Sequence, residues 1–528
     1  MRQGETPGGG WTRRRFLATG GLLVVGGAAA AALAVEATAK GGASAPSPVA
    51  SGSSPPPIAR RRYRSRTDLS AAQVDVAASV GAVAPGLVFI TPNNGAAPDG
   101  LLITDNAGKP VWIRPDTGSN AANFRPAVYH GKPVLTWWEG AVNGGFGAGQ
   151  LVIVDDTYTE LLRFGAGAGR KADIHEFQIT PQGTALILTD AGVALAAGGS
   201  PPPWQNWDCI VEEVDIATGA VLFEWHSADH ISSDESVIPP PGAAPSPSAT
   251  ANAVAGTATA TPAASAAAPT IPVYDSVHVN AIELDTDGNL IVSARNTSAI
   301  YKVDRSTGEI RWRLGGKRSD FTMGPGATFA LQHDPRRHPD GTLSVFDDGA
   351  APSTSRAIFL DVDEVAMTAN LVRAYPHPHG KLAMSQGNME VLPNGNVFVG
   401  WGSTGYASEF SSDGQLLFDA DFSGSIQSYR CFRYPWTAKP KGAPDLALDP
   451  PSSGAVNAYA SWNGATEVAS WEALGGVDPT RLASLGAFPR TDFETVLAVK
   501  AATGYVAVNA LDSTGTVLGT SLAVAIPE

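Results

Sequence analysis

The sequence is poor in cysteine and in charge. Only Cys209 and Cys431 occur among 528 residues, which excludes a scaffold held by several disulfides; whether these two thiols pair is open. Charged residues make up 16% of the chain, against about a quarter in average globular proteins. Positive charge is the scarcer kind, with 36 Lys and Arg against 50 Asp and Glu, which argues against nucleic acid as a partner.

A long uncharged apolar run stands near the start of the chain. Residues 16–35 follow Arg13, Arg14 and Arg15, and Ala37-Thr38-Ala39 is typical of a cleavage site. We therefore predict that residues 1–39 are a twin-arginine signal peptide, read by the twin-arginine translocase, and that the protein is exported to the cell envelope or beyond. The alternative is an uncleaved N-terminal membrane anchor, because about 20 apolar residues can span a bilayer.

Two stretches of low complexity interrupt the remaining chain. Residues 40–80 are rich in Pro, Ser, Ala and Arg and are predicted to be a flexible tether. Residues from about 237 to 269 are nearly all Ala, Pro, Thr and Ser, and they lack the large apolar side chains that would offset the entropy of ordering. We expect them to form a disordered insertion within a folded domain.

Between residues 81 and 440 the chain repeats one pattern six times. Each unit contains four short apolar runs separated by turns, as at Asp287-Gly288 and Thr307-Gly308 in the clearest copy. Four strands in each unit of roughly 40–55 residues are typical of a propeller blade. We therefore predict an all-β protein: a six-bladed β-propeller, followed at residues 441–528 by a small Ig-like β-sandwich.

Three histidines take equivalent places in this repeat. His175, His278 and His333 each begin a unit and precede its turn by a similar number of residues, and Arg295 follows the second strand of the unit that His278 opens. If the first strand of each blade is innermost, these side chains meet at the axis. Three interpretations remain open from the residues alone: hydrogen bonding to the blade backbones, a metal site, or covalent catalysis by an imidazole on an anionic group.

Several ordered motifs resemble the arylsulfotransferase family, in the branch found in actinobacteria and fungi. These are DIHEF at 173–177, YDSVHVN at 274–280, SARNTSAIYKVD at 293–304, LQHD at 331–334, SQGNMEVLPNGNVFVGWG at 385–402 and YRCFRYPW at 429–436. The resemblance implies an enzyme that moves a sulfuryl group from a phenolic sulfate ester to a phenol through a sulfated histidine, without a nucleotide donor, cofactor or metal.

The same resemblance implies roles for individual residues. His333 matches the histidine that becomes sulfated, His278 and Arg295 match the pair that binds the sulfuryl oxygens, and His175 matches a further catalytic histidine. The predicted substrate-binding residues are Asn280, Gln332 and Asn388.

A contrasting hypothesis is a non-catalytic extracellular propeller that binds partners. Trp312, Trp401 and Trp436 are expected to pack between strands rather than to bind an acceptor.

Overall fold

The computed structural model describes residues 60–93, 100–115, 117–193, 204–242, 272–349, 353–500 and 504–528. Strands dominate this part of the chain, and its helices are short, namely α1 (Ser227–His230) and single 3-10 turns. The predicted all-β class is confirmed. The predicted signal peptide at 1–39 and most of the predicted insertion at about 237–269 lie outside the described residues.

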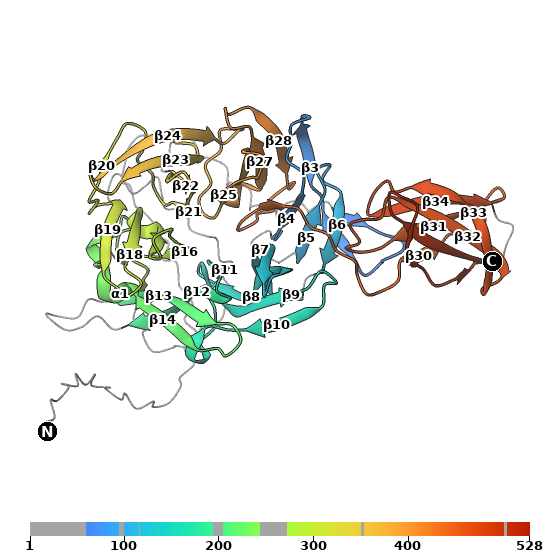
Figure 1. Ribbon diagram of the computed structural model, residues 1–528, viewed down its shortest axis with the longest axis horizontal. Helices are drawn as coiled ribbons and strands as arrows, with labels where there is room; N and C mark the ends of the chain where they lie inside the picture. Colours follow the sequence, from blue (N-terminus) through green and yellow to red (C-terminus); the bar gives the residue numbers. More distant parts are fainter. Residues whose placement is uncertain are drawn as a thin grey trace, which may run out of the picture. The chain divides into compact units, whose positions relative to one another are not determined.

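Six sheets succeed one another around a ring (Figure 1), and their strands pair antiparallel except for two short edge strands. The first three hold β4 (Leu87–Ile90), β5 (Leu101–Thr104), β6 (Pro110–Arg114) and β29 (Phe432–Tyr434); β7 (Asn120–Tyr129), β8 (Lys132–Asn143), β9 (Phe146–Val154) and β10 (Glu160–Phe164); and β11 (Phe177–Ile179), β12 (Thr184–Val193), β13 (Gln205–Asp215) and β14 (Val221–His226), with β15 (Val273–Tyr274) beside β13.

The next three sheets repeat this plan. They hold β16 (Val279–Leu284), β17 (Leu290–Ala294), β18 (Ala299–Val303) and β19 (Ile310–Gly315); β21 (His333–Arg337), β22 (Leu343–Asp347), β23 (Arg356–Asp363) and β24 (Thr368–Pro376), with β20 (Thr322–Met323) at the edge; and β25 (Asn388–Val391), β26 (Val397–Gly400), β27 (Tyr406–Phe410) and β28 (Leu416–Asp421), with β3 (Asp75–Ser79) outermost.

The innermost strands hold the ring together. Contacts join β7 to both β29 and β11, β21 to both β16 and β25, β12 to β16, and β26 to β29, so every sheet touches the next and the sixth returns to the first. Glycines in the predicted turns adopt the left-handed conformation that such turns require, as Gly288 (φ 81°) and Gly341 (φ 87°) do.

Both ends of the ring segment take part in its closure. β29 pairs with β4 as the inner strand of the first sheet, and β3 pairs with β28 as the outer strand of the sixth. The chain thus supplies strands to two sheets from positions far apart in sequence. The first and last parts of the segment are thereby hydrogen-bonded into the ring.

Two further sheets follow the ring segment. They consist of β30 (Asp445–Leu448), β31 (Ala455–Ser461) and β34 (Glu494–Lys500), and of β32 (Ser470–Asp478), β33 (Arg481–Pro489), β35 (Tyr505–Leu511), β36 (Val517–Thr520) and β37 (Val524–Ala525). Val456, Trp471, Leu497 and Val508 belong to one buried core that both sheets share. The boundary predicted after residue 440 falls between β29 and β30.

Part of the predicted tether at 40–80 is ordered, which corrects that prediction. Residues 60–79 form β1 (Arg60–Arg62), β2 (Ser70–Ala72) and β3. Tyr63 packs on Phe493 with 4.4 Å between ring centroids, and Arg61 lies 3.1 Å from the carboxylate of Asp492. Arg61, Arg64 and Arg66 pair with acidic side chains, and Tyr63 and Leu69 are buried. Residues 40–59 lie outside the described chain.

Cys209 and Cys431 are both buried free thiols, so the structure holds no bridge between them. Within the described residues, no helix has the length and apolar character needed to cross a bilayer. Trp312, Trp401 and Trp436 each lie in a buried core cluster between strands, which confirms that they pack the sheets.

Candidate functional site

The three histidines lie at the starts of three innermost strands. His175 precedes β11 by two residues, His278 directly precedes β16, and His333 is the first residue of β21. The rings of His175 and His278 are 4.7 Å apart, and the Tyr429 ring lies 5.5 Å from His175 and 6.4 Å from His333. We call these four residues, with Arg295, the histidine cluster.

Each histidine of the cluster is hydrogen-bonded to a carboxylate through its Nδ1 atom. His175 contacts Asp173, His278 lies 2.6 Å from Asp275 Oδ2, and His333 lies 2.6 Å from Asp348 Oδ2. A carboxylate at Nδ1 keeps the ring proton on that nitrogen and leaves Nε2 with its lone pair. All three imidazoles are therefore held in the tautomer that suits a nucleophile or a base.

Sequence reasoning missed these three carboxylates. Asp173 and Asp275 stand two and three residues before their histidines, inside motifs that the sequence analysis quoted, so a search for neighbouring acids would have found them. Asp348 is 15 residues from His333 and meets it only because β22 folds back on β21. That contact has no local signature.

His333 is kept neutral by its surroundings. Its exposed fraction is 2%, and burial, followed by the positive charge of Arg295, lowers its pKa well below 6.5. The backbone N–H of Gln386 donates to Nε2 at 3.2 Å, which an Nε2–H tautomer would not allow. Burial also raises the pKa of the Asp348 carboxyl.

Arg295 reaches the cluster from the 3-10 turn that follows β17. Its Nη1 donates to Asn296 Oδ1 at 2.9 Å, and its Nη2 donates to the Met384 carbonyl at 2.9 Å. Met384 belongs to the same loop as Gln386, so this loop contacts both the guanidinium and the His333 ring. The positive charge of Arg295 also contributes to lowering the pKa of His278, after burial.

The amides predicted to bind substrate join neighbouring innermost strands instead. Asn280 Nδ2 donates to the Gln332 carbonyl at 2.8 Å, and Gln332 Nε2 donates to the Ala299 carbonyl at 2.9 Å. Asn388 exchanges two hydrogen bonds with the backbone of Cys431. All three amides are buried. These bonds give them a structural use, and substrate binding by them stays a prediction.

An aromatic wall that the sequence analysis did not anticipate stands beside the cluster. Phe146 follows the Gly144-Gly145 turn between β8 and β9, and its ring lies 5.1 Å from that of His278 and 4.8 Å from that of Trp207. Both glycines have positive φ, which lets the turn bring Phe146 over the imidazole. Its only sequence signal is a Gly-rich hairpin, which does not reveal where the tip points.

Further along the same strands lies a layer of buried charge. Arg430 is fully buried; its Nη1 lies 3.0 Å from Glu176 Oε1, and its Nη2 lies 3.3 Å from Asp334 Oδ1. Arg336 Nη2 lies 2.8 Å from Glu176 Oε2, and Arg125 Nη2 lies 3.5 Å from Glu176 Oε1. We call these five residues the arginine layer. Because Glu176 and Asp334 directly follow His175 and His333, the layer lies next to the histidine cluster.

Over the described ranges, no group of three or more His, Cys, Asp or Glu side chains is arranged to hold a metal ion. The cluster contains imidazoles that are each held at Nδ1 by a carboxylate, a guanidinium and an aromatic wall. Such a set can position an anionic group attached to an aromatic ring and attack it with a nitrogen lone pair.

One comparison with known proteins points the same way. A family model described as arylsulfotransferase (ASST) matches residues 125–423, a range that contains His175, His278, Arg295 and His333. No curated protein was found to match the chain. Similar solved structures include a protein of unknown function from Bacteroides caccae, with 14% identity and a TM-score of 0.38 over 66% of this chain and 99% of that one. Another is a catalytically inactive virginiamycin B lyase from Staphylococcus aureus, with 9% identity and a TM-score of 0.32 over 74% and 97%.

Proposed function

The chain belongs to the arylsulfotransferase (ASST) family, and we propose that it transfers a sulfuryl group from a phenolic sulfate ester to a phenol through a sulfated His333. The observation that carries this proposal is the state of His333: a neutral ring whose Nδ1 is held by Asp348 and whose Nε2 retains its lone pair.

In the first half of the reaction, His333 Nε2 attacks the sulfur of the ester. An N–S bond forms, the bond between sulfur and the aryl oxygen breaks, and the phenolate leaves with the electron pair and takes up a proton from solvent. Asp348 offsets the positive charge that the sulfated ring acquires. Arg295 offsets the negative charge of the sulfuryl oxygens. His278 assists when its Nε2 carries a proton, as an imidazolium whose Nδ1–H is held by Asp275.

The Gln386 N–H has a part in the same step. It occupies Nε2 in the free protein, so it must give up that hydrogen bond when sulfur approaches, and it is then placed to donate to a sulfuryl oxygen. In the second half, an acceptor phenol loses its proton to solvent and its oxygen attacks sulfur. The N–S bond breaks and the lone pair returns to Nε2.

Phe146 and Trp207 are proposed to hold the aryl ring. Phe146 lies beside His278 and against Trp207, in both cases at the distance at which aromatic rings stack or meet edge to face. This arrangement would keep the aromatic part of donor and acceptor next to the sulfuryl site.

The fold and location complete the proposal. We interpret the ring of six sheets as a six-bladed β-propeller and the C-terminal sheets as an Ig-like sandwich. We further propose export by the twin-arginine route. Cell fractionation of a variant with Arg13→Lys and Arg14→Lys tests this last point, and unchanged export would refute it.

The activity is tested with purified protein, an aryl sulfate and a phenol, in the presence of a metal chelator. We expect phenol release that depends on the acceptor, and a sulfated His333 peptide in mass spectra of protein quenched during turnover. His333→Asn should lose at least 10³-fold in kcat, as expected when a covalent nucleophile is removed. His379→Asn is the matched control, because His379 is exposed and lies outside the cluster. Absence of both phenol release and sulfation in the wild-type protein would refute the proposal.

A further inference from the structure

A cavity of about 570 Å³ lies away from the histidine cluster, where β7, β11 and β29 end. Its lining includes Arg125 and Val128 from β7, Gln178 and Ile179 from β11, and Tyr434 from β29. We call it the distal cavity. Its volume falls within the range of small-molecule sites, which is about 300–1,000 Å³.

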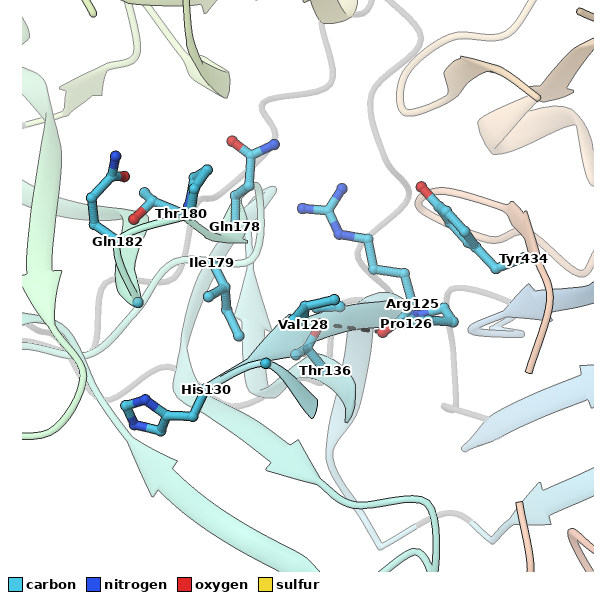
Figure 2. Close-up of a pocket in the computed structure, with 14 residues that line it drawn as sticks. Arg125, Pro126, Val128, His130, Thr136, Gln178, Ile179, Thr180, Gln182 and Tyr434 are labelled. Carbon is cyan, nitrogen blue, oxygen red and sulfur yellow. Dashed lines mark hydrogen bonds between the residues drawn. The ribbon is translucent and has the colours of Figure 1, made fainter. Parts of the chain in front are cut away.

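Polar groups converge on the distal cavity from three strands. Figure 2 shows the guanidinium of Arg125 and the amide of Gln178 directed toward the same space, with the phenol oxygen of Tyr434 across from them. Arg125 Nη2 donates to the Phe177 carbonyl at 2.7 Å. Among the described residues, no acceptor bonds its Nε or Nη1, so part of this cation has no hydrogen-bond partner in the protein.

Apolar groups line the other side of the same space. Val128 is 64% exposed and Ile179 is half-buried, and Pro126 stands beside them (Figure 2). An exposed valine next to a partly unpaired arginine makes the cavity amphipathic. A ligand that fills it needs an anionic head and an apolar body.

The nearby acids do not oppose an anion. Burial raises the pKa of Glu390 to about 8, so this carboxyl beside Tyr434 is mostly uncharged at neutral pH. Glu176 is shared among Arg125, Arg336 and Arg430, and Glu283 lies 2.8 Å from Arg336. The remaining negative charge around the cavity is therefore compensated by arginines.

The arginine layer separates the distal cavity from the histidine cluster. Along β11 and the residues before it, His175 belongs to the cluster, Glu176 to the layer and Gln178 to the cavity. Glu176 and Arg430 are fully buried and lie between the histidine cluster and the distal cavity. A small molecule in the distal cavity thus occupies a site distinct from that of the sulfuryl group.

We propose that the distal cavity binds a small organic carboxylate, whose head group meets Arg125 and Gln178 and whose apolar body lies against Val128. A carboxylate head accepts charge-assisted hydrogen bonds from the guanidinium. Gln178 Nε2 donates one hydrogen to Glu283 Oε2 at 3.4 Å and has a second N–H for the ligand. Inorganic anions can contact only Arg125 and Gln178, and neutral aromatic molecules can contact only the apolar surface at Val128.

Benzoate is a suitable probe, titrated into the purified protein by calorimetry. We expect saturable binding to one site, at least tenfold weaker binding of benzyl alcohol, and at least tenfold weaker binding of benzoate to Val128→Trp, in which the indole fills the cavity. Val365→Trp is the matched control, because Val365 is 96% exposed in the turn between β23 and β24. His333→Asn should bind benzoate as the wild type does.

Three results would overturn the proposal. The first is absence of saturable benzoate binding, and the second is equal binding by Val128→Trp and wild type. The third is a loss of binding in His333→Asn, which would place benzoate at the histidine cluster. Arg125→Gln should also lose binding; thermal unfolding of that variant shows whether it is still folded, and Val128→Trp keeps the test valid if it is not.

Discussion

The histidine cluster and the arginine layer are neighbours at the axis, and they treat buried charge in opposite ways. Burial lowers the pKa of His333 and of His278, so these rings shed their protons and stay neutral. Burial alone would raise the pKa of Glu176, yet the guanidinium groups of Arg336 and Arg430 outweigh it and hold that pKa well below its usual range.

The difference follows from the side chains available. A histidine can lose its proton near neutral pH, so burial is accommodated by neutralisation. Arginine cannot do so, and its buried charge must be matched by carboxylates. The first arrangement leaves a lone pair for chemistry, whereas the second makes a rigid ionised support. Four variants or conditions test this contrast.

The largest expected effect is on stability and concerns Arg430. Arg430→Met leaves the buried carboxylates of Glu176 and Asp334 with one cation fewer, which should lower the free energy of unfolding by about 3–5 kcal/mol. Denaturant unfolding measures it. The matched control is Arg311→Met, because Arg311 pairs with Asp304 at the surface and its loss should cause no measurable change. Equal stability of the two variants would contradict an ionised support.

Much of this architecture could be predicted from the sequence. The repeats were visible because each turn needs a glycine with positive φ, as at Gly288 and Gly341. The closure by β3 and β29 was not visible, because it joins segments more than 300 residues apart through backbone hydrogen bonds that leave no pattern in the side chains. The prediction of a flexible tether is wrong for residues 60–79, because composition does not reveal that Tyr63 packs against Phe493.

The candidate site was partly predictable because its histidines follow the sequence repeat. His175, His278 and His333 repeat at equivalent positions, and strand geometry then brings them together. Asp348 could not be found, because its contact depends on the fold of a hairpin. The arginine layer was also missed: Arg430 stands in a recognised motif, but only the packed strands show that it meets Glu176.

The second prediction concerns the carboxylate behind the nucleophile. In Asp348→Asn the neutral amide no longer offsets charge on the His333 ring, and the tautomer is no longer fixed. We expect kcat to fall by about 10² or more with KM nearly unchanged. Asp340→Asn, in the exposed turn of the same hairpin, is the control. A fall confined to KM would mean that Asp348 serves binding rather than the chemistry of His333.

The third prediction is the pH dependence that the neutral imidazole implies. Because the pKa of His333 in the fold is below its ordinary 6.5, the reactive neutral form persists below pH 6.5. As pH falls through the folded pKa, kcat/KM should decline about tenfold per pH unit. The unfolded chain binds this proton first, so the group's contribution to stability declines as pH drops below 6.5. An acid limb centred at or above 6.5 would show that the ring is not neutralised by burial.

The smallest expected effect concerns the aromatic wall, formed by Phe146 and Trp207 beside the histidine cluster. Phe146 carries no charge, so Phe146→Leu keeps an apolar surface near His278 and removes only the ring contact, a loss of about 0.5–1.5 kcal/mol. KM for aryl sulfates should rise roughly two- to tenfold at nearly constant kcat, while Phe146→Tyr restores it. Alkyl sulfates should show no such change, because they have no ring to stack. If both donor classes respond alike, Phe146 shapes the cluster rather than selecting the aryl group.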